Sequence, residues 1–173
     1  MTAGGAPLVI GLGANLGTDA AIVARFVDVV AALAARGPTR TSRVYRSAAL
    51  TAGDPDFLNA AVALTPTAPW SPLAVLAALH ALEAGHGRVR AGARRWGPRP
   101  LDLDVLVWGD LELALPTLVV PHPRVHERSF ALAPLIDLLG PDWVLPGRGV
   151  ALGALAEVAG PPLAVTAYVL GAS

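Results

Sequence analysis

The stretch FLNAAVALT, residues 57–65, is the segment from which the fold of this chain can be worked out. Its side chains alternate: Leu58, Ala60, Val62 and Leu64 share one face, and Phe57, Asn59, Ala61 and Ala63 share the other. Because successive side chains of a strand point to opposite sides of a sheet, the segment is predicted to be a β-strand.

A helix is predicted to follow this strand, with Ser71 as N-cap, Pro72 in the first turn and an end near Gly85. Its expected apolar stripe is Leu73, Leu76, Leu79 and Leu82. Residues 101–108 are predicted to form the next strand. Upstream, the apolar run 8–12 predicts a strand, and glycines 11–17 predict a turn.

A second helix is predicted to begin at Thr18 or Asp19 and to end at Gly37-Pro38. Its apolar face consists of Ile22, Phe26, Val29 and Leu33. Residues 41–46 alternate weakly and complete the order β-α-β-β-α-β. This order predicts an α+β fold of the ferredoxin-like, split-βαβ type, an antiparallel sheet with helices on one face.

A helical and irregular tail is expected after the sheet, with a helix between 127 and 139 and weaker elements at 143–145 and 152–158. No domain linker interrupts the sequence. The 173 residues, 54% of them hydrophobic, therefore predict a single domain over 1–173.

The charges exclude several classes of protein. Thirteen basic and thirteen acidic residues give a net charge of zero, which argues against a nucleic-acid-binding protein. There is no cysteine and no lysine, so thiolate metal sites and lysine nucleophiles are excluded. The uncharged run 57–82 contains three prolines and five polar residues, and the N-terminus has no signal-peptide pattern. We expect a soluble cytoplasmic protein with no membrane partner.

Asp102 and Asp104 are the first candidates for chemistry. Residues two apart on a strand point to the same face, so both carboxylates project together. Two like charges side by side repel unless a cation neutralises them, and magnesium favours one or two carboxylates together with phosphate oxygens. The alternative is a pair of solvated acids on an edge strand.

Five arginines precede the aspartates within twelve residues that contain no acid: Arg88, Arg90, Arg94, Arg95 and Arg99. The glycines and prolines among them indicate a loop. Guanidinium groups bind phosphate oxygens in a bidentate manner, so an arginine loop beside paired carboxylates suits phosphoryl transfer. Salt bridges between these groups are the alternative.

Two further groups of residues have weaker signals. Phe57 and Asn59 share a strand face and could hold a flat heterocycle by stacking and by an amide contact. His122 lies between two prolines in a stiff loop, where an imidazole could contact phosphate, although a lone loop histidine is more often only exposed.

The glycines at 11, 13 and 17 are the main competing signal, because they lie between a strand and a helix as in a dinucleotide-binding turn. The spacing is GxGxxxG, and no acidic residue follows a second strand. Two alternatives to an ATP-dependent enzyme therefore remain: a non-catalytic ferredoxin-like binding domain, and an oxidoreductase, which would bind NADP.

Taken together, four segments resemble the 6-hydroxymethyl-7,8-dihydropterin pyrophosphokinases of folate biosynthesis. They are GLGANLG at 11–17, FLNAAVAL at 57–64, the region 83–106 with GRVR and RWGPRPLDLDVL, and VPHPRVHERSFALAPL at 120–135. The RWGPR-x-LDLD block is the most specific of the four. The resemblance implies transfer of pyrophosphate from MgATP to a pterin hydroxymethyl group, with release of AMP.

The resemblance also implies roles for individual residues. Asp102 and Asp104 would bind two magnesium ions, and Arg88 and Arg99 would act with them as catalytic residues on the phosphates. The expected ATP-binding residues are Glu83, Arg90, Trp96, Val105, His122 and Arg128. The expected pterin-binding residues are Ser47, Leu50, Phe57, Asn59 and Phe130. We expect a monomer whose partners are ATP and the dihydropterin.

Departures from the family pattern affect three places. One extra residue between Arg90 and Trp96 makes the assignment of Arg94 and Arg95 ambiguous. Ser47-Ala48-Ala49 stands where many members have a proline-containing run. Phe57 replaces a frequent tyrosine and keeps the stacking surface without the hydroxyl.

Overall fold

The computed structural model describes residues 6–49, 51–89 and 97–171. A central sheet contains six strands: β1 (Leu8–Ala14), β2 (Thr39–Thr41), β3 (Tyr45–Ser47), β4 (Phe57–Leu64), β5 (Asp102–Trp108) and β10 (Ala164–Val165). Their order is β10-β3-β4-β1-β5, with β2 also paired to β4, and every pairing is antiparallel. The predicted ferredoxin-like arrangement is confirmed, with an additional strand from the C-terminal part of the chain.

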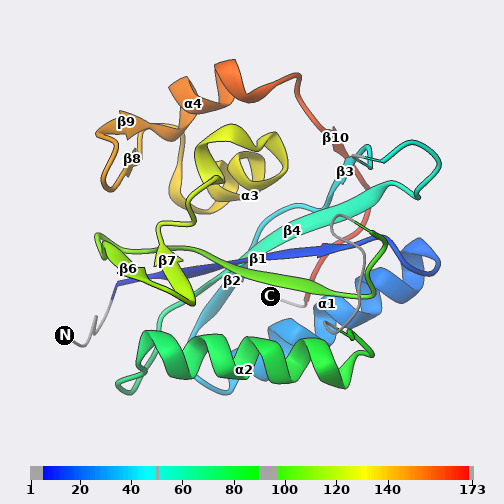
Figure 1. Ribbon diagram of the computed structural model, residues 1–173, viewed down its shortest axis with the longest axis horizontal. Helices are drawn as coiled ribbons and strands as arrows, with labels where there is room; N and C mark the ends of the chain where they lie inside the picture. Colours follow the sequence, from blue (N-terminus) through cyan, green and yellow to red (C-terminus); the bar gives the residue numbers. More distant parts are fainter. Residues whose placement is uncertain (1–5, 50, 90–96, 172–173) are drawn as a thin grey trace.

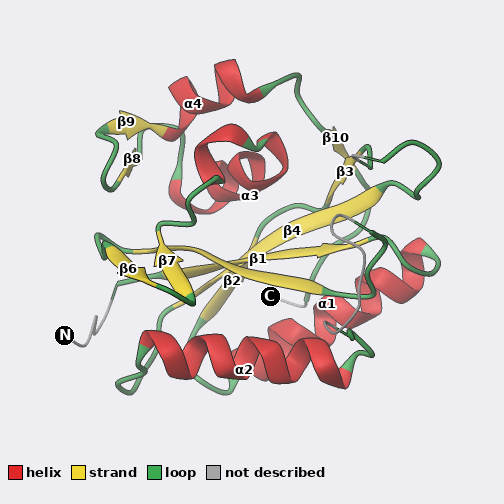
Figure 2. Cartoon of the chain, viewed as in Figure 1, coloured by secondary structure: helices red, strands yellow, loops and turns green. Residues whose placement is uncertain are grey.

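Helices α1 (Asp19–Ala34) and α2 (Pro72–Gly85) cover one face of the sheet, and α3 (Ser129–Leu139) and α4 (Leu152–Ala159) lie on the other side (Figures 1 and 2). The remaining elements are short: β6 (Leu113–Leu115), β7 (Leu118–Val120), the 3-10 turn η1 (Val125–Glu127), β8 (Val144–Leu145) and β9 (Val150–Ala151). The prediction that the helices lie on one face of the sheet holds for α1 and α2. The tail adds α3 and α4, which form a second helical layer on the other face.

Two apolar clusters follow from these layers. The larger joins α1 and α2 to one sheet face, and the four residues predicted for the apolar face of α1 are all buried in it. The smaller joins α3 and α4 to the other face, through residues such as Ala61, Ala63, Leu132 and Leu152. The strand β4 therefore has apolar side chains packed on both faces, as its alternation allowed.

Thr18 caps α1, since its hydroxyl accepts a hydrogen bond from the Ala21 amide, and Ser71 caps α2 in the same way. The predicted stripe of α2 is correct in part: Leu79 is buried and Leu76 and Leu82 pack against the core, but Leu73 does not. Val75, Leu79 and Glu83 are buried, whereas Leu73 is 51% exposed. A spacing of three residues turns the helix by about 300°, so a stripe of four leucines at that spacing winds around the helix.

The sheet also departs from regular alternation in β5. The register between β1 and β5 shifts between Val9 and Ile10, which pair with Val107 and Val105. Leu106 is the extra residue of this bulge. Regular alternation would place Val107 with Leu103 and Val105, but because of the bulge it lies in the α3-side cluster. No helix within the described residues is long and apolar enough to cross a membrane.

Candidate active site

A pocket lies over the α3 side of the sheet, where α3 begins. Its walls combine aromatic, amide, acidic and basic side chains from β3, β4, β5 and the segments before α3. They are Ser47, Phe57, Asn59, Arg99, Asp102, Asp104, His122, Arg128 and Phe130, with Gly11, Gly13 and Leu106 among the smaller lining groups. Residues separated by more than eighty positions in sequence are thus brought to one cavity.

The floor of the pocket is β1, and its glycines have a different role from the predicted turn. Gly11 and Gly13 lie inside the strand, which continues to Ala14, so the interpretation as a dinucleotide-binding turn is wrong. Gly13 pairs with Asn59 on one side and with Asp102 on the other. A β-carbon on Gly11 would lie 3.1 Å from the Leu106 side chain. Because Gly11 and Gly13 have no side chains, the space above β1 stays open between the side chains of β4 and β5.

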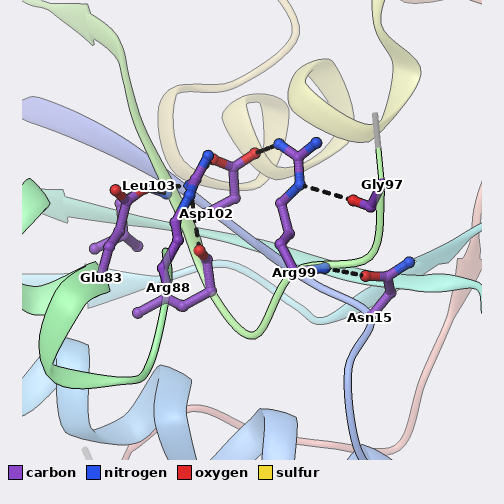
Figure 3. A network of polar contacts seen from close by, with 8 residues as sticks. Asn15, Glu83, Arg88, Gly97, Arg99, Asp102 and Leu103 are labelled. Atoms are coloured by element: carbon purple, nitrogen blue, oxygen red, sulfur yellow. Dashed lines mark hydrogen bonds and ion pairs between the residues drawn. The ribbon is translucent and has the colours of Figure 1, made fainter. Parts of the chain in front are cut away.

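Asp102 is held by two guanidinium groups (Figure 3). Arg99 Nη1 lies 2.7 Å from Asp102 Oδ2, and Arg88 Nη1 contacts Oδ1 of the same carboxylate. Only Arg99 lines the pocket, whereas Arg88 lies behind Asp102 with 15% of its side chain exposed. The alternative that these arginines form salt bridges with the aspartates is therefore correct for Asp102 in this structure.

Glu83 completes the network from below. It is 1% exposed on α2, and its Oε1 accepts hydrogen bonds from Arg88 Nη1 at 2.5 Å and from the Leu103 amide at 2.8 Å. Figure 3 shows Arg88 between Glu83 and Asp102. Because a buried carboxylate is stable only when paired, Glu83 fixes both Arg88 and the start of β5.

Asp104 has a different environment from Asp102. Its side chain has no hydrogen bond or ion pair with any residue that the structure describes. Burial is the main cause that raises the pKa of Asp104 to about 6; the neighbouring charge of Asp102 acts in the same direction, and the charge of Arg128 opposes both. A charge that is costly to form and faces a pocket is one that a bound cation would stabilise.

The donor set fits magnesium better than a metal held by protein alone. Within the described residues there is no group of three or more histidine, cysteine, aspartate or glutamate side chains that could hold an ion. Two carboxylates on one strand face leave the other positions of a hard cation to water and phosphate oxygens, which is the coordination that magnesium prefers.

His122 enters the pocket as a neutral group. Burial and the charge of Arg128 together lower the pKa of His122 to about 4. Its Nδ1 accepts a hydrogen bond from the Arg124 amide at 3.1 Å, so the proton of the neutral ring belongs on Nε2. His122 can therefore donate one hydrogen bond to an anionic ligand at neutral pH without supplying a charge.

The opposite wall is aromatic. Phe57 and Phe130 both line the pocket, and the guanidinium carbon of Arg128 lies 5.5 Å from the Phe130 ring centre. Asn59 is 5% exposed, and its Nδ2 donates to Ser47 Oγ at 2.8 Å. Its amide is therefore held in one orientation at the pocket edge, as recognition of a flat polar ring requires.

The structure separates the predicted site residues into three sets. Nine line the pocket and are named above. Glu83, Arg88 and Val105 do not: the first two support Asp102, and the Val105 side chain is 4% exposed in the core. Leu50, Arg90 and Trp96, together with the ambiguous pair Arg94 and Arg95, lie outside the described residues.

Sequence reasoning did not identify Asn15, which is 1% exposed. Its Oδ1 accepts from the Arg99 amide at 2.8 Å, and its Nδ2 donates to the Pro55 carbonyl at 3.0 Å. Asn15 thus joins the segment before Phe57 to the segment that carries Arg99. A buried asparagine needs partners on both sides of its amide, but nothing in the sequence indicates which ones.

Comparisons with known proteins identify the family of this chain. The family described as 7,8-dihydro-6-hydroxymethylpterin-pyrophosphokinase (HPPK) matches residues 9–140. The chain belongs to the HPPK family. HPPK relatives include the 2-amino-4-hydroxy-6-hydroxymethyldihydropteridine pyrophosphokinase of Synechocystis, 38% identical over 86% of this chain and 74% of that protein. The protein of the same name from Methylorubrum extorquens is 40% identical over 82% of this chain and 87% of its own length.

Solved HPPK structures have the same fold. The Plasmodium falciparum HPPK-DHPS crystal structure with pteroate superimposes with a TM-score of 0.67 over 88% of this chain, at 13% identity. This chain spans 42% of that bifunctional chain, so the likeness concerns the fold of one part of it. The resemblance inferred from the sequence motifs is confirmed by the family match.

Proposed function

We propose that this chain is an ATP-dependent diphosphotransferase that transfers pyrophosphate from MgATP to the hydroxymethyl group of 6-hydroxymethyl-7,8-dihydropterin and releases AMP in folate biosynthesis. The observation that carries the proposal is the pocket itself. A wall with two phenylalanines and an oriented amide faces a wall with two carboxylates and arginines, across a glycine floor. One wall suits a heterocycle and the other suits metal-bound phosphates.

The acceptor lies on the aromatic wall. Phe57 and Phe130 stack on the two faces of the pterin, and the Oδ1 of Asn59 accepts a hydrogen bond from the ring's N–H edge, since Nδ2 is already bound to Ser47. Leu50 is assigned to the same subsite from its place in the family motif.

ATP lies on the charged wall. Asp102 and Asp104 hold two magnesium ions, which when bound supply Lewis-acid neutralisation of phosphate charge. Arg99, Arg128 and the Nε2–H of His122 bind phosphate oxygens, and Arg88 with Glu83 holds Asp102 in place. Arg90 and Trp96 are assigned to ATP from the motif. Val105 lies on the edge strand β5, where only its main chain is available to a ligand.

The reaction follows from this juxtaposition. The hydroxyl oxygen of the pterin attacks the β-phosphorus in line, and the bond between that phosphorus and the oxygen shared with the α-phosphorus breaks. AMP leaves with that oxygen, and the hydroxyl proton passes to solvent. The protein contributes mainly by orienting the two substrates and by neutralising charge, so a strong general base is not required.

We also propose that the enzyme works as a monomer in the cytoplasm, with ATP and the dihydropterin as its partners. The pocket supports the monomer, because both of its walls come from one chain. Sedimentation of the purified protein at micromolar concentration tests it, and a dimer mass would contradict it.

Asp104→Asn is the sharpest test of the function, because the Asp104 side chain makes no ion pair with a described residue. With MgATP and the dihydropterin, wild type is expected to form AMP, and the variant should form AMP at least about 100-fold more slowly. Asp110→Asn, in the exposed turn after β5, is the matched control and should have wild-type turnover.

Three outcomes would contradict the proposal in different ways. ATP binding without pterin-dependent AMP would favour a non-catalytic binding domain. NADP binding would favour an oxidoreductase. Wild-type AMP formation by Asp104→Asn, with Asp110→Asn equally active, would refute the metal assignment and leave the activity in place.

A further inference from the structure

The C-terminal segment 164–170, which we call the strap, lies outside residues 9–140 that match the HPPK family. After α4 the chain runs to the edge of the sheet and pairs with β3 as β10, at the right of Figure 1. The strap is thus an addition to the sheet at its β3 edge. Strand β3 ends at Ser47, which lines the pocket.

Hydrogen bonds tie the strap to β3 and to the residues just before it. Ala164 and Val165 pair with Arg46 and Tyr45 in antiparallel register. Thr166 donates to the Val44 carbonyl twice, from its amide at 2.9 Å and from its hydroxyl at 3.0 Å. These contacts give a three-residue strand a neighbour on each side, because β4 pairs with its other edge.

One apolar side chain anchors the far end of the strap. Leu170 is 2% exposed in the larger core cluster, and its carbonyl accepts a hydrogen bond from the Thr41 hydroxyl at 3.0 Å. Its neighbour Val169 is 76% exposed. Leu170 is the one buried residue of the strap, so it supplies most of the strap's apolar attachment.

The strand held in this way leads directly to the amide that faces the heterocycle. Ser47 follows Arg46 in β3 and pairs with Phe57, and its hydroxyl accepts the hydrogen bond from Asn59 that orients this amide. By contrast, Asp102 and Asp104 lie on β5, which is separated from β3 by β4 and β1. A shift of β3 should therefore displace the residues of the aromatic wall more than those of the charged wall.

We propose that the strap is a positioning element for the pterin subsite: it fixes β3, so that Ser47 holds Asn59 in the orientation that reads the acceptor ring. The inference rests on the proposed function for the identity of the acceptor. The strap touches neither substrate. It acts through Ser47, and its loss alters recognition of the acceptor more than binding of ATP.

The test compares two neighbouring substitutions in the strap, Leu170→Ala and the matched control Val169→Ala. Loss of the anchor is expected to raise KM for the dihydropterin about three- to tenfold, the equivalent of one hydrogen bond, with KM for ATP changed less than about twofold. Val169→Ala should leave both constants unchanged. Thermal melts of each variant ensure that rates are measured on folded protein.

Thr166→Val keeps the buried anchor and removes the two hydrogen bonds of the Thr166 hydroxyl, one donated to the Val44 carbonyl and one accepted from the Tyr168 amide. It serves if Leu170→Ala does not fold. Its pterin KM should rise in the same direction by a smaller factor. Ser47→Ala supplies the second arm: if the strap acts through Ser47, Leu170→Ala should add little in the Ser47→Ala background. Multiplicative effects, equal rises in both KM values, or an unchanged pterin KM would overturn the inference. Absence of AMP from wild type would instead refute the proposed function.

Discussion

Glu83 is the residue whose removal should most clearly expose how the site is built. It is fully buried at the end of the stripe Val75, Leu79, Glu83 on α2, and one of its oxygens serves both Arg88 and the amide of Leu103. Glu83→Ala would leave the Leu103 amide without its side-chain acceptor. The Arg88 guanidinium would keep only its contacts with the Leu101 carbonyl and the Asp102 carboxylate.

The expected cost can be bounded from these contacts. Breaking a buried ion pair by removing one partner costs about 3–5 kcal/mol, and a buried donor left unsatisfied costs about 1–3 kcal/mol. Arg88 keeps Asp102, so the lower end applies, and we expect a loss of about 3 kcal/mol in the free energy of unfolding. Glu83→Gln keeps an oxygen for both donors and should lose about 1 kcal/mol.

Urea unfolding followed by far-UV circular dichroism measures these losses. Glu157→Ala, an exposed glutamate on α4, is the matched control and should change stability by less than about 0.5 kcal/mol. We also expect KM for ATP to rise in Glu83→Ala, because Asp102 loses the support of a fixed Arg88. A Glu83→Ala loss no larger than that of Glu157→Ala would refute the reasoning, as would equal losses for the alanine and glutamine variants.

Two further predictions concern Asn15, which joins two segments beside the pocket, and Asp104, which lines it. Asn15→Ala should raise KM for both substrates and destabilise the protein by about 1–3 kcal/mol, since it frees the Arg99 amide and the Pro55 carbonyl together; an effect on one substrate only would contradict this. Burial raises the pKa of Asp104 to about 6, so turnover should fall as pH drops through about 6. The same raised pKa makes ionisation unfavourable to the fold, so the Asp104 contribution to stability should increase from pH 6 to pH 4 and vanish in Asp104→Asn.

Local signals predicted most of the fold. Alternation in 57–65, the helix caps Thr18 and Ser71, and the spacing of Ile22, Phe26, Val29 and Leu33 each depend on residues near one another in sequence. They were sufficient because the ferredoxin-like order follows from the sequence of elements. The strap has no such signal: a two-residue strand has no period, and its pairing with β3 is fixed by contacts across about 120 positions.

The supporting residues of the site were harder to predict for the same reason. Asp102 and Asp104 could be placed on one face because strand geometry is local. The functions of Glu83 and Asn15 depend on which distant groups meet them, respectively the Leu103 amide and the Arg99 amide. The spacing of the leucines also led to a predicted α2 stripe that contained only leucines. The fully buried residues of α2 are instead Val75, Leu79 and Glu83, and the Glu83 carboxylate supports the site.

Two aspartates that look equivalent in the motif LDLD are therefore chemically different. Asp102 is paired with Arg88 and Arg99, so its carboxylate is oriented before any ligand binds. Asp104, one step along the same face, is buried without such a partner among the described residues, and its ionisation is costly. A cation at this face recovers the cost at Asp104, while phosphate oxygens compete with Asp102 for Arg99. Metal and nucleotide binding at this wall are thus favourable to one another, which is the arrangement that a MgATP site requires.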